Sequence, residues 1–307
     1  MSNSTISITK RGNHILRRVI AKEIKMCLKL KLLRERKLHE LFASEDKKSL
    51  LETSGVYATN PVTCHVIFDN KNAVGCVDLS LEPTDNNHLI PVLNVGIGFE
   101  DITFDPKNQR YHLIIEALKN GNKKFQGLVS EYDKNFGFRR CTLLEPTFKK
   151  RNKGFEGVGH FWRGNDEYLV GLAEAATRSK EHSGSGLLYV FRRAYDGTWV
   201  TEREIELPPS ARFKDYAAIA LRQNRVAVVS QESRRVWIGE INDAFNGFNQ
   251  MVGDVYRFPT DNYCNVEGVS WVSDNQLVMV SDCCKKDQKK RCREKDQSIH
   301  LFQIATA

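Results

Sequence analysis

Acidic residues recur along the chain at a spacing that could bring several carboxylates together. Each stands at the head of a short apolar segment, and the five segments follow one another at intervals of 46 to 59 residues. The first repeat has a serine at the matching position, so the lead residues are Ser54, Glu100, Glu156, Asp215 and Glu267. Ca²⁺ accepts about six to eight oxygen ligands in loose geometry, whereas Mg²⁺ demands a tighter octahedron. If the lead residues converge, they predict a calcium site.

A second polar residue ends the next β-branched run of every repeat. This second tier consists of Asp69, Glu116, Glu174, Gln231 and Asp282. Carboxylates that are gathered in one place repel one another, and this raises their pKa values unless a cation or hydrogen-bond donors compensate. A hard cation is the simplest compensator, so these residues are predicted to lie beside the lead residues.

Basic residues follow the second run in each repeat, among them Lys71, Arg178, Arg234 and Lys285. If they project over the carboxylates, the site would have a cation at its base and a rim of ammonium and guanidinium groups. Such a combination favours a phosphate or another anionic group. The structural alternative is that the acids cap loops and accept hydrogen bonds between repeats, while the basic side chains are only solvated.

The elements that must position these residues are predicted to be strands. Besides the lead segment, each repeat has two further apolar, β-branched runs, and four of the five repeats have a fourth. This period is typical of four-stranded blades, so the predicted fold is an all-β β-propeller of five blades. A sixth blade in residues 1–48 would need four strands from a stretch without turn residues. Antiparallel pairing places the start of each inner strand beside the end of the second, so both acidic sets are expected at one mouth of the central channel.

The N-terminal segment has two interpretations. The last repeat ends after its third strand, and an open edge would be a liability. Residues 25–36 could supply the closing strand, with Leu28, Leu30 and Leu32 on one side. Alternatively, residues 15–42 form basic amphipathic helices, because Lys, Leu, Arg and Glu favour helix. Residues 1–48 are accordingly predicted to be a basic extension, and residues 49–307 the propeller domain.

Composition and charge limit the compartments and partners that we expect for this protein. The chain of 307 residues contains no apolar run long enough to span a bilayer, and its start lacks the apolar stretch of a secretory signal. Eight thinly spread cysteines indicate reduced thiols and a cytoplasmic protein, with organellar targeting by the basic start as the alternative. The net charge is +8, and the basic excess of residues 10–37 alone is larger than this. A nucleic-acid partner would therefore depend on the N-terminal segment alone.

Short motifs around three lead residues resemble known families. These motifs are Gly98-Phe99-Glu100-Asp101, Gly154-Phe155-Glu156-Gly157 and Asn265-Val266-Glu267-Gly268. They resemble the phytase-like propellers with esterase-like activity and the SdiA-regulated propellers. The order Ser, Glu, Glu, Asp, Glu is also similar to the central Ca²⁺ ring of the five-bladed calcium-dependent nucleotidases (apyrases), where a serine stands at the position matching Asp215. The resemblance covers residues 50–306 and implies a propeller with an axial Ca²⁺; the motifs are short, and phytase-like enzymes have six blades.

Two functions follow from this sequence. The first is a Ca²⁺-supported hydrolase of phosphate or other ester bonds, which would act on an anionic small molecule. The second is a non-catalytic propeller that presents its loops to a protein partner or ligand, since a fold alone does not specify activity. The sequence gives no evidence for a nucleophile. His160 could face the channel as a general base, but the neighbouring Phe161 and Trp162 favour a packed core histidine.

Overall fold

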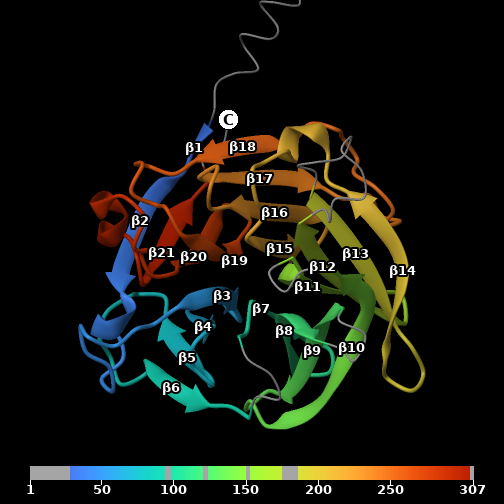
Figure 1. Ribbon diagram of the computed structural model, residues 1–307, viewed down its shortest axis with the longest axis horizontal. Coiled ribbons are helices and arrows are strands. Elements are labelled where there is room, and N and C mark those ends of the chain that lie inside the picture. The colour runs from blue at the N-terminus through green and yellow to red at the C-terminus, as the bar shows by residue number, and fades with distance from the viewer. Residues whose placement is uncertain (1–27, 94–97, 120–123, 150–152, 175–185, 305–307) are drawn as a thin grey trace, which may run out of the picture.

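The computed structural model describes residues 28–93, 98–119, 124–149, 153–174 and 186–304. Its strands form five sheets arranged around a central axis (Figure 1). The first sheet consists of β3 (Thr53–Ala58), β4 (Thr63–Phe68), β5 (Ala73–Asp78) and β6 (His88–Pro91). The second consists of β7 (Asp101–Asp105), β8 (Arg110–Lys119), β9 (Phe125–Asp133) and β10 (Phe138–Phe148). The third consists of β11 (Phe155–Arg163), β12 (Asp166–Glu174), β13 (Gly186–Arg193) and β14 (Trp199–Glu206).

The last two sheets also recruit strands from the N-terminal segment. The fourth consists of β15 (Ala218–Arg222), β16 (Arg225–Ser230), β17 (Arg235–Glu240), β18 (Asp254–Arg257) and β1 (Leu28–Lys29). The fifth consists of β19 (Val266–Ser273), β20 (Gln276–Ser281), β21 (Ser298–Gln303) and β2 (Lys31–Lys37). Three short 3₁₀ helices lie in the connections, η1 (Leu38–Glu40), η2 (Pro209–Ala211) and η3 (Lys290–Glu294). The chain is thus a five-bladed β-propeller, as the repeat predicts.

Local sequence explains which strands lie inside the ring. The run Val226-Ala227-Val228-Val229 of β16 is buried throughout, because this strand packs between neighbouring blades on both faces. The outer strand β14 alternates buried or half-buried residues with exposed ones along Trp199 to Glu206, as expected for a strand with one face toward water. Five apolar clusters fill the spaces between adjacent blades. The core is therefore a ring of blade interfaces.

The N-terminal segment closes the ring as a strand, and the helical alternative is wrong for residues 28–37. Strand β2 pairs antiparallel with β21, with Lys31 opposite Gln303 and Lys37 opposite Ser298. Leu28, Leu30 and Leu32 pack on the cluster between the fourth and fifth blades, which explains why burial prevails over helix propensity. Strand β1 adds a contact that the sequence did not predict, because it pairs parallel with β18 of the fourth blade. Residues 1–27 lie outside the described residues, so the predicted boundary at residue 48 stays a prediction.

The expectation that the cysteines are reduced is wrong for one pair. Cys264, in the loop that leads into β19, forms a disulfide with Cys292 in η3, and their Cα atoms are 5.4 Å apart. The two residues are 28 positions apart, and the fold brings their loops together over the fifth blade. Five other described cysteines carry free thiols.

Among the described residues, none of the helices is long and apolar enough to cross a membrane.

Candidate functional site: an acidic channel mouth

All five lead residues line one cavity of about 420 Å³ at the mouth of the central channel. We call this cavity the acidic mouth. Three second-tier acids, Asp69, Glu116 and Asp282, line it too, together with Gln231. The side chain of the remaining second-tier residue, Glu174, lies outside the described part of the structure. The structure thus brings the five lead residues together with four of the five second-tier residues.

Strand register is what brings the two sets together. Ser54, Glu156 and Glu267 are each the second residue of an inner strand, and Glu100 directly precedes another. In the fifth blade, Val266 at the start of β19 pairs with Ser281 at the end of β20. Glu267 and Asp282 are the next residues along these two strands, so antiparallel pairing places them at the same end of the sheet.

Burial and mutual repulsion disfavour the charged forms of the glutamates in the acidic mouth. Burial, followed by the charges of Glu156 and Asp69, holds the pKa of Glu100 well above its ordinary value. The pKa of Glu156 is raised by burial and by Glu116 and Glu267. Burial and the charge of Asp282 likewise raise the pKa of Glu267. These carboxyl groups therefore need protons or a cation when they come together.

Glu116 and Asp282 extend this acidic set. Burial raises the pKa of Glu116, whose carboxyl group is hydrogen-bonded to that of Glu156. Burial raises the pKa of Asp282 to about 6. The Oδ1 atom of Asp282 is buried and has no hydrogen-bond partner among the described residues. An unsatisfied buried oxygen of this kind is expected where a ligand or ion completes a site.

Ser54 and Asp215 are bound differently from the glutamates. The Ser54 hydroxyl donates to the carbonyl oxygen of Phe99. Asp215 accepts a hydrogen bond from the Ser230 hydroxyl, and the backbone N–H of Glu232 lies 3.1 Å from each of its carboxylate oxygens. Their oxygens are already engaged within the protein, so the more available ligands are the glutamates and Asp282.

The predicted basic rim forms only in part. Lys285 lines the acidic mouth, with its Nζ 3.9 Å from Oε1 of Glu267. Lys71 instead pairs with Glu45 at 2.6 Å and does not line this cavity. Arg234 lines two neighbouring cavities, and Arg178 lies outside the described residues. Side chains in loops do not follow the strand period, which is why the repeat placed the acids better than the bases.

Sequence reasoning missed several residues of the acidic mouth. These are Glu52, Lys153, Tyr216, Ala217, Glu232 and Cys283. Each lies within three positions of a lead or second-tier residue. Including the flanking positions of every repeat would have identified them.

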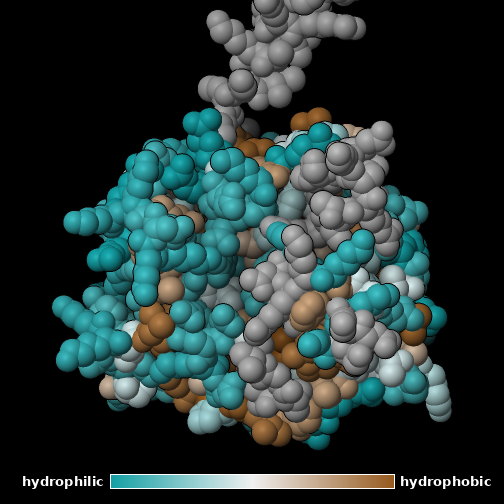
Figure 2. Space-filling view, in the orientation of Figure 1, coloured by the Kyte–Doolittle hydropathy of each residue, from teal (hydrophilic) through white to brown (hydrophobic). Residues whose placement is uncertain are grey.

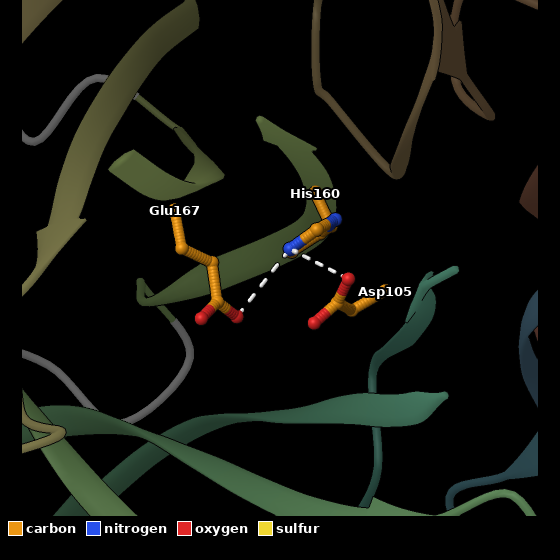
Figure 3. A group of neighbouring side chains, drawn as sticks. All are labelled: Asp105, His160 and Glu167. Atoms are coloured by element: carbon orange, nitrogen blue, oxygen red, sulfur yellow. Dashed lines mark ion pairs between the residues drawn. The ribbon is translucent and has the colours of Figure 1, made fainter. Parts of the chain in front are cut away.

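A second group of potential metal ligands lies toward the other end of the channel, where blades two and three meet. Figure 3 shows the carboxylates of Asp105 and Glu167 both directed at the imidazole of His160. The His160 Nε2 atom is 3.4 Å from Glu167 Oε1 and 3.9 Å from Asp105 Oδ1. The His160 side chain is 1% exposed. The structure therefore places His160 in a buried interface and not at the acidic mouth.

Arginines already neutralise this second group. The Arg110 Nη2 atom lies 3.1 Å from Asp105 Oδ2 and 2.9 Å from Glu167 Oε2. Arg193 pairs with Glu131 at 2.9 Å and approaches Glu167 at 3.6 Å. Burial would raise the pKa of Asp105, but hydrogen bonds from Trp162, Asn108 and Arg110 hold it below its ordinary value. We therefore assign this network the role of joining two blades.

Comparison with known proteins identifies the fold and no family. No family model matches the chain, and no curated protein matches it. The crystal structure of Myxococcus xanthus glutaminyl cyclase is similar, with 11% identity over 91% of this chain and 99% of that one, at a TM-score of 0.54. The PQQ-bound aldose sugar dehydrogenase of Streptomyces coelicolor is 10% identical over 90% of this chain and 98% of that one, with a TM-score of 0.48.

The RRP9 WD40 repeats are 9% identical over 90% of this chain and all of that one, with a TM-score of 0.46. At 11% identity, the similarity to the glutaminyl cyclase structure supports a shared fold and nothing finer. The chain is a β-propeller. Its resemblance to the phytase-like, SdiA-regulated and apyrase propellers stays a prediction.

Proposed function

We propose that the acidic mouth binds Ca²⁺ and that the protein hydrolyses phosphate or other ester bonds of an anionic small molecule there. One observation carries this proposal. Glu100, Glu156, Glu267 and Asp282 converge from three blades on one cavity, and burial and mutual repulsion raise their pKa values. A folded chain that keeps such a cluster is expected to have a ligand that relieves the repulsion.

The donor set fits a hard cation. Carboxylate oxygens dominate the described lining, and no histidine belongs to it. Zn²⁺ prefers sulfur and nitrogen ligands in a tetrahedron, for which Cys283 alone would be suitable here. Ligands presented by several blades cannot close into a small octahedron as readily as into a loose shell, which favours Ca²⁺ over Mg²⁺.

The residues around the cation have distinct roles in this proposal. Ca²⁺ would supply Lewis-acid polarisation of a phosphoryl oxygen. Lys285, whose ammonium group faces Glu267, would hold the anionic group of the substrate over the acidic mouth. Glu116 and Glu156 lie together in the cavity and both have raised pKa values, so this pair would accept and return a proton during hydrolysis. The resemblance of the ring order to the calcium-dependent nucleotidases supports the same assignment.

Binding and turnover should be tested separately on the full chain. Calorimetric titration with Ca²⁺ after chelator treatment is expected to give saturable binding, which the double variant Glu100→Gln/Glu267→Gln should lose. A control, Asp166→Asn/Glu206→Gln, removes two exposed acids of the third blade and should bind as the wild type does. Hydrolysis of p-nitrophenyl phosphate and of nucleoside diphosphates should then require Ca²⁺ and stop with chelator.

Each outcome has a definite meaning. Binding without turnover of any ester would leave a calcium-binding propeller that serves as a scaffold or ligand receptor. Absence of Ca²⁺ binding at millimolar concentration would refute the metal site itself.

A further inference from the structure

Basic side chains form a ladder across three strands of the fourth blade. In β1, β18 and β17, Lys29 lies opposite Arg257, and Arg257 lies opposite Arg235. Figure 1 shows these three strands side by side at the edge of the ring. Residues directly opposite each other in a sheet point to the same face, and like charges in such pairs are destabilising. Three cations in one row therefore need an explanation.

Protection of the sheet edge does not explain this ladder. Lysines on edge strands commonly prevent strand pairing with other molecules. This role is enough to explain Lys29, which lies on the edge strand β1. Strands β17 and β18, however, are interior strands, because β1 covers β18. Arg235 and Arg257 thus repel each other where no edge needs protection.

The ladder lines a cavity of about 500 Å³. Its charged lining consists of Lys29, Arg234, Arg235 and Arg257, with one carboxylate, Asp261. Within the described part of the chain, none of the four cations forms an ion pair with a carboxylate. The hydrogen bonds of Arg235 go to the backbone oxygens of Ser233 and Arg234, at 3.1 and 2.8 Å. Arg235 and Arg257 thus have no ion-pair partner among the described residues, and Asp261 is the one acid in the lining.

The basic cavity and the acidic mouth each share lining residues with a third cavity. A third cavity of about 360 Å³ shares Arg234 with the basic one and Gln231 and Glu232 with the acidic one. The disulfide between Cys264 and Cys292 belongs to the wall of this third cavity and ties two of its loops together. In Figure 2 the surface of the fifth blade, on the left of this view, is largely hydrophilic. The basic cavity and the acidic mouth thus adjoin the same third cavity.

We infer that the basic cavity binds the phosphate groups of a small anion that carries several of them. Arginine presents a planar fork of donors that matches phosphate oxygens, and a bound anion would turn the repulsion within the ladder into attraction. Anion binding here does not require Ca²⁺, because the ladder and the acidic mouth are separate sets of residues. When both are filled, one ligand could extend from the ladder toward the acidic mouth.

Tripolyphosphate is the probe for a direct test, titrated by calorimetry into the full-length protein in chelator at low ionic strength. The test variant is Arg235→Gln/Arg257→Gln. The control variant is Arg139→Gln/Arg192→Gln, which removes the same charge from β10 and β13 of two other blades. We expect the test variant to bind about tenfold more weakly or worse, and the control within about twofold of the wild type.

Salt dependence, the acidic-mouth variant and thermal unfolding each test the ladder in a different way. Binding should weaken as salt is added, and Glu100→Gln/Glu267→Gln should bind tripolyphosphate as the wild type does. Because the ladder is repulsive without an anion, the test variant should unfold at the same temperature as the wild type or higher in phosphate-free buffer. Equal affinity of wild type and test variant would overturn the inference, and so would binding of a single-stranded oligonucleotide without binding of tripolyphosphate.

Discussion

Removing two carboxylates from the acidic mouth should change stability in opposite directions with and without Ca²⁺. In chelator, Glu100→Gln/Glu267→Gln relieves the repulsion that raises the pKa values of both glutamates and of their neighbours. Each pKa unit of relieved repulsion is worth about 1.4 kcal/mol. The variant should therefore be at least as stable as the wild type at pH 7.5 when no metal is present.

With Ca²⁺ the order should reverse. A ligand that binds only the folded state adds about 2.7 kcal/mol at about 100 times its dissociation constant. For a chain of this size such a gain raises the melting temperature by about 5 °C. The wild type should gain this amount, while the variant, which lacks two ligands, should gain little.

The assay is thermal unfolding in chelator and in excess Ca²⁺, with the control Asp166→Asn/Glu206→Gln measured alongside. The control should respond to Ca²⁺ as the wild type does. If the variant is destabilised equally in both conditions, the glutamates act as structural hydrogen-bond partners and the metal site is refuted.

Four further predictions concern other parts of the molecule. Ca²⁺ affinity should fall as the pH is lowered through about 6, because the carboxylate ligands must lose their protons when they bind the cation. Calorimetric titrations in buffers of different ionisation enthalpy would measure the number of protons released. Glu35→Gln should lower the free energy of unfolding in urea at pH 7 by about 1 kcal/mol, after allowance for solvent screening. Burial would raise the pKa of Glu35, but hydrogen bonds from His300 and Lys295 outweigh burial and lower this pKa to about 2. The difference in stability between variant and wild type should therefore vanish as the pH falls from about 4.5 toward 2. Glu167→Ala should cost about 2 kcal/mol in the same assay, because Arg110 loses its 2.9 Å contact with Glu167 and keeps only Asp105 and Glu131. The variant should not alter Ca²⁺ affinity. Reduction of the Cys264–Cys292 disulfide should lower the free energy of unfolding by about 3 kcal/mol, because the unfolded chain gains conformational entropy. Equal midpoints of urea unfolding with and without reductant would contradict this prediction.

Chelator should also reveal the raised pKa values as a pH dependence of stability. An acid whose folded pKa lies above its unfolded one stabilises the fold below the unfolded pKa, and that contribution is lost as the pH rises through the folded pKa. For Asp282 the window runs from about 4 to above 6, given its ordinary value of 3.8 and its folded value of about 6. Ca²⁺ should remove this decline, because the cation replaces the protons.

The fold could be predicted from the sequence because strand positions repeat. The third and fourth apolar runs of the repeats coincide with observed strands to within a few residues, as at β13 (Gly186–Arg193) and β14 (Trp199–Glu206). The closing strand was harder to predict, since residues 28–37 have strong helix formers and a partly alternating apolar pattern at once. Pairing with β21 and burial of Leu30 decide in favour of the strand.

The residues of the acidic mouth could be predicted where their position on a strand determines which way their side chains point. Lead residues sit at strand starts, where register determines which side chains meet. Lys71 and Arg234 sit in turns, and Arg234 has a positive φ of 50°, so their directions depend on local backbone conformation that the period does not encode. The disulfide forms because the fold brings together two loops from different parts of the fifth blade. The spacing of the two cysteines in the sequence does not predict that these loops approach each other.

The two ends of the channel provide an internal comparison for the metal proposal. Near blades two and three, the acids Asp105, Glu131 and Glu167 contact Arg110 and Arg193 at 2.9 to 3.6 Å. At the acidic mouth, the described lining has nine carboxylic acids against two lysines. In this network between blades two and three, arginines neutralise the carboxylates. The described lining of the acidic mouth contains no arginine, although burial raises the pKa values of Glu100, Glu156 and Glu267, and burial makes carboxylate charge costly. The excess of nine carboxylic acids over two lysines in the described lining therefore supports the proposal that a cation binds at the acidic mouth.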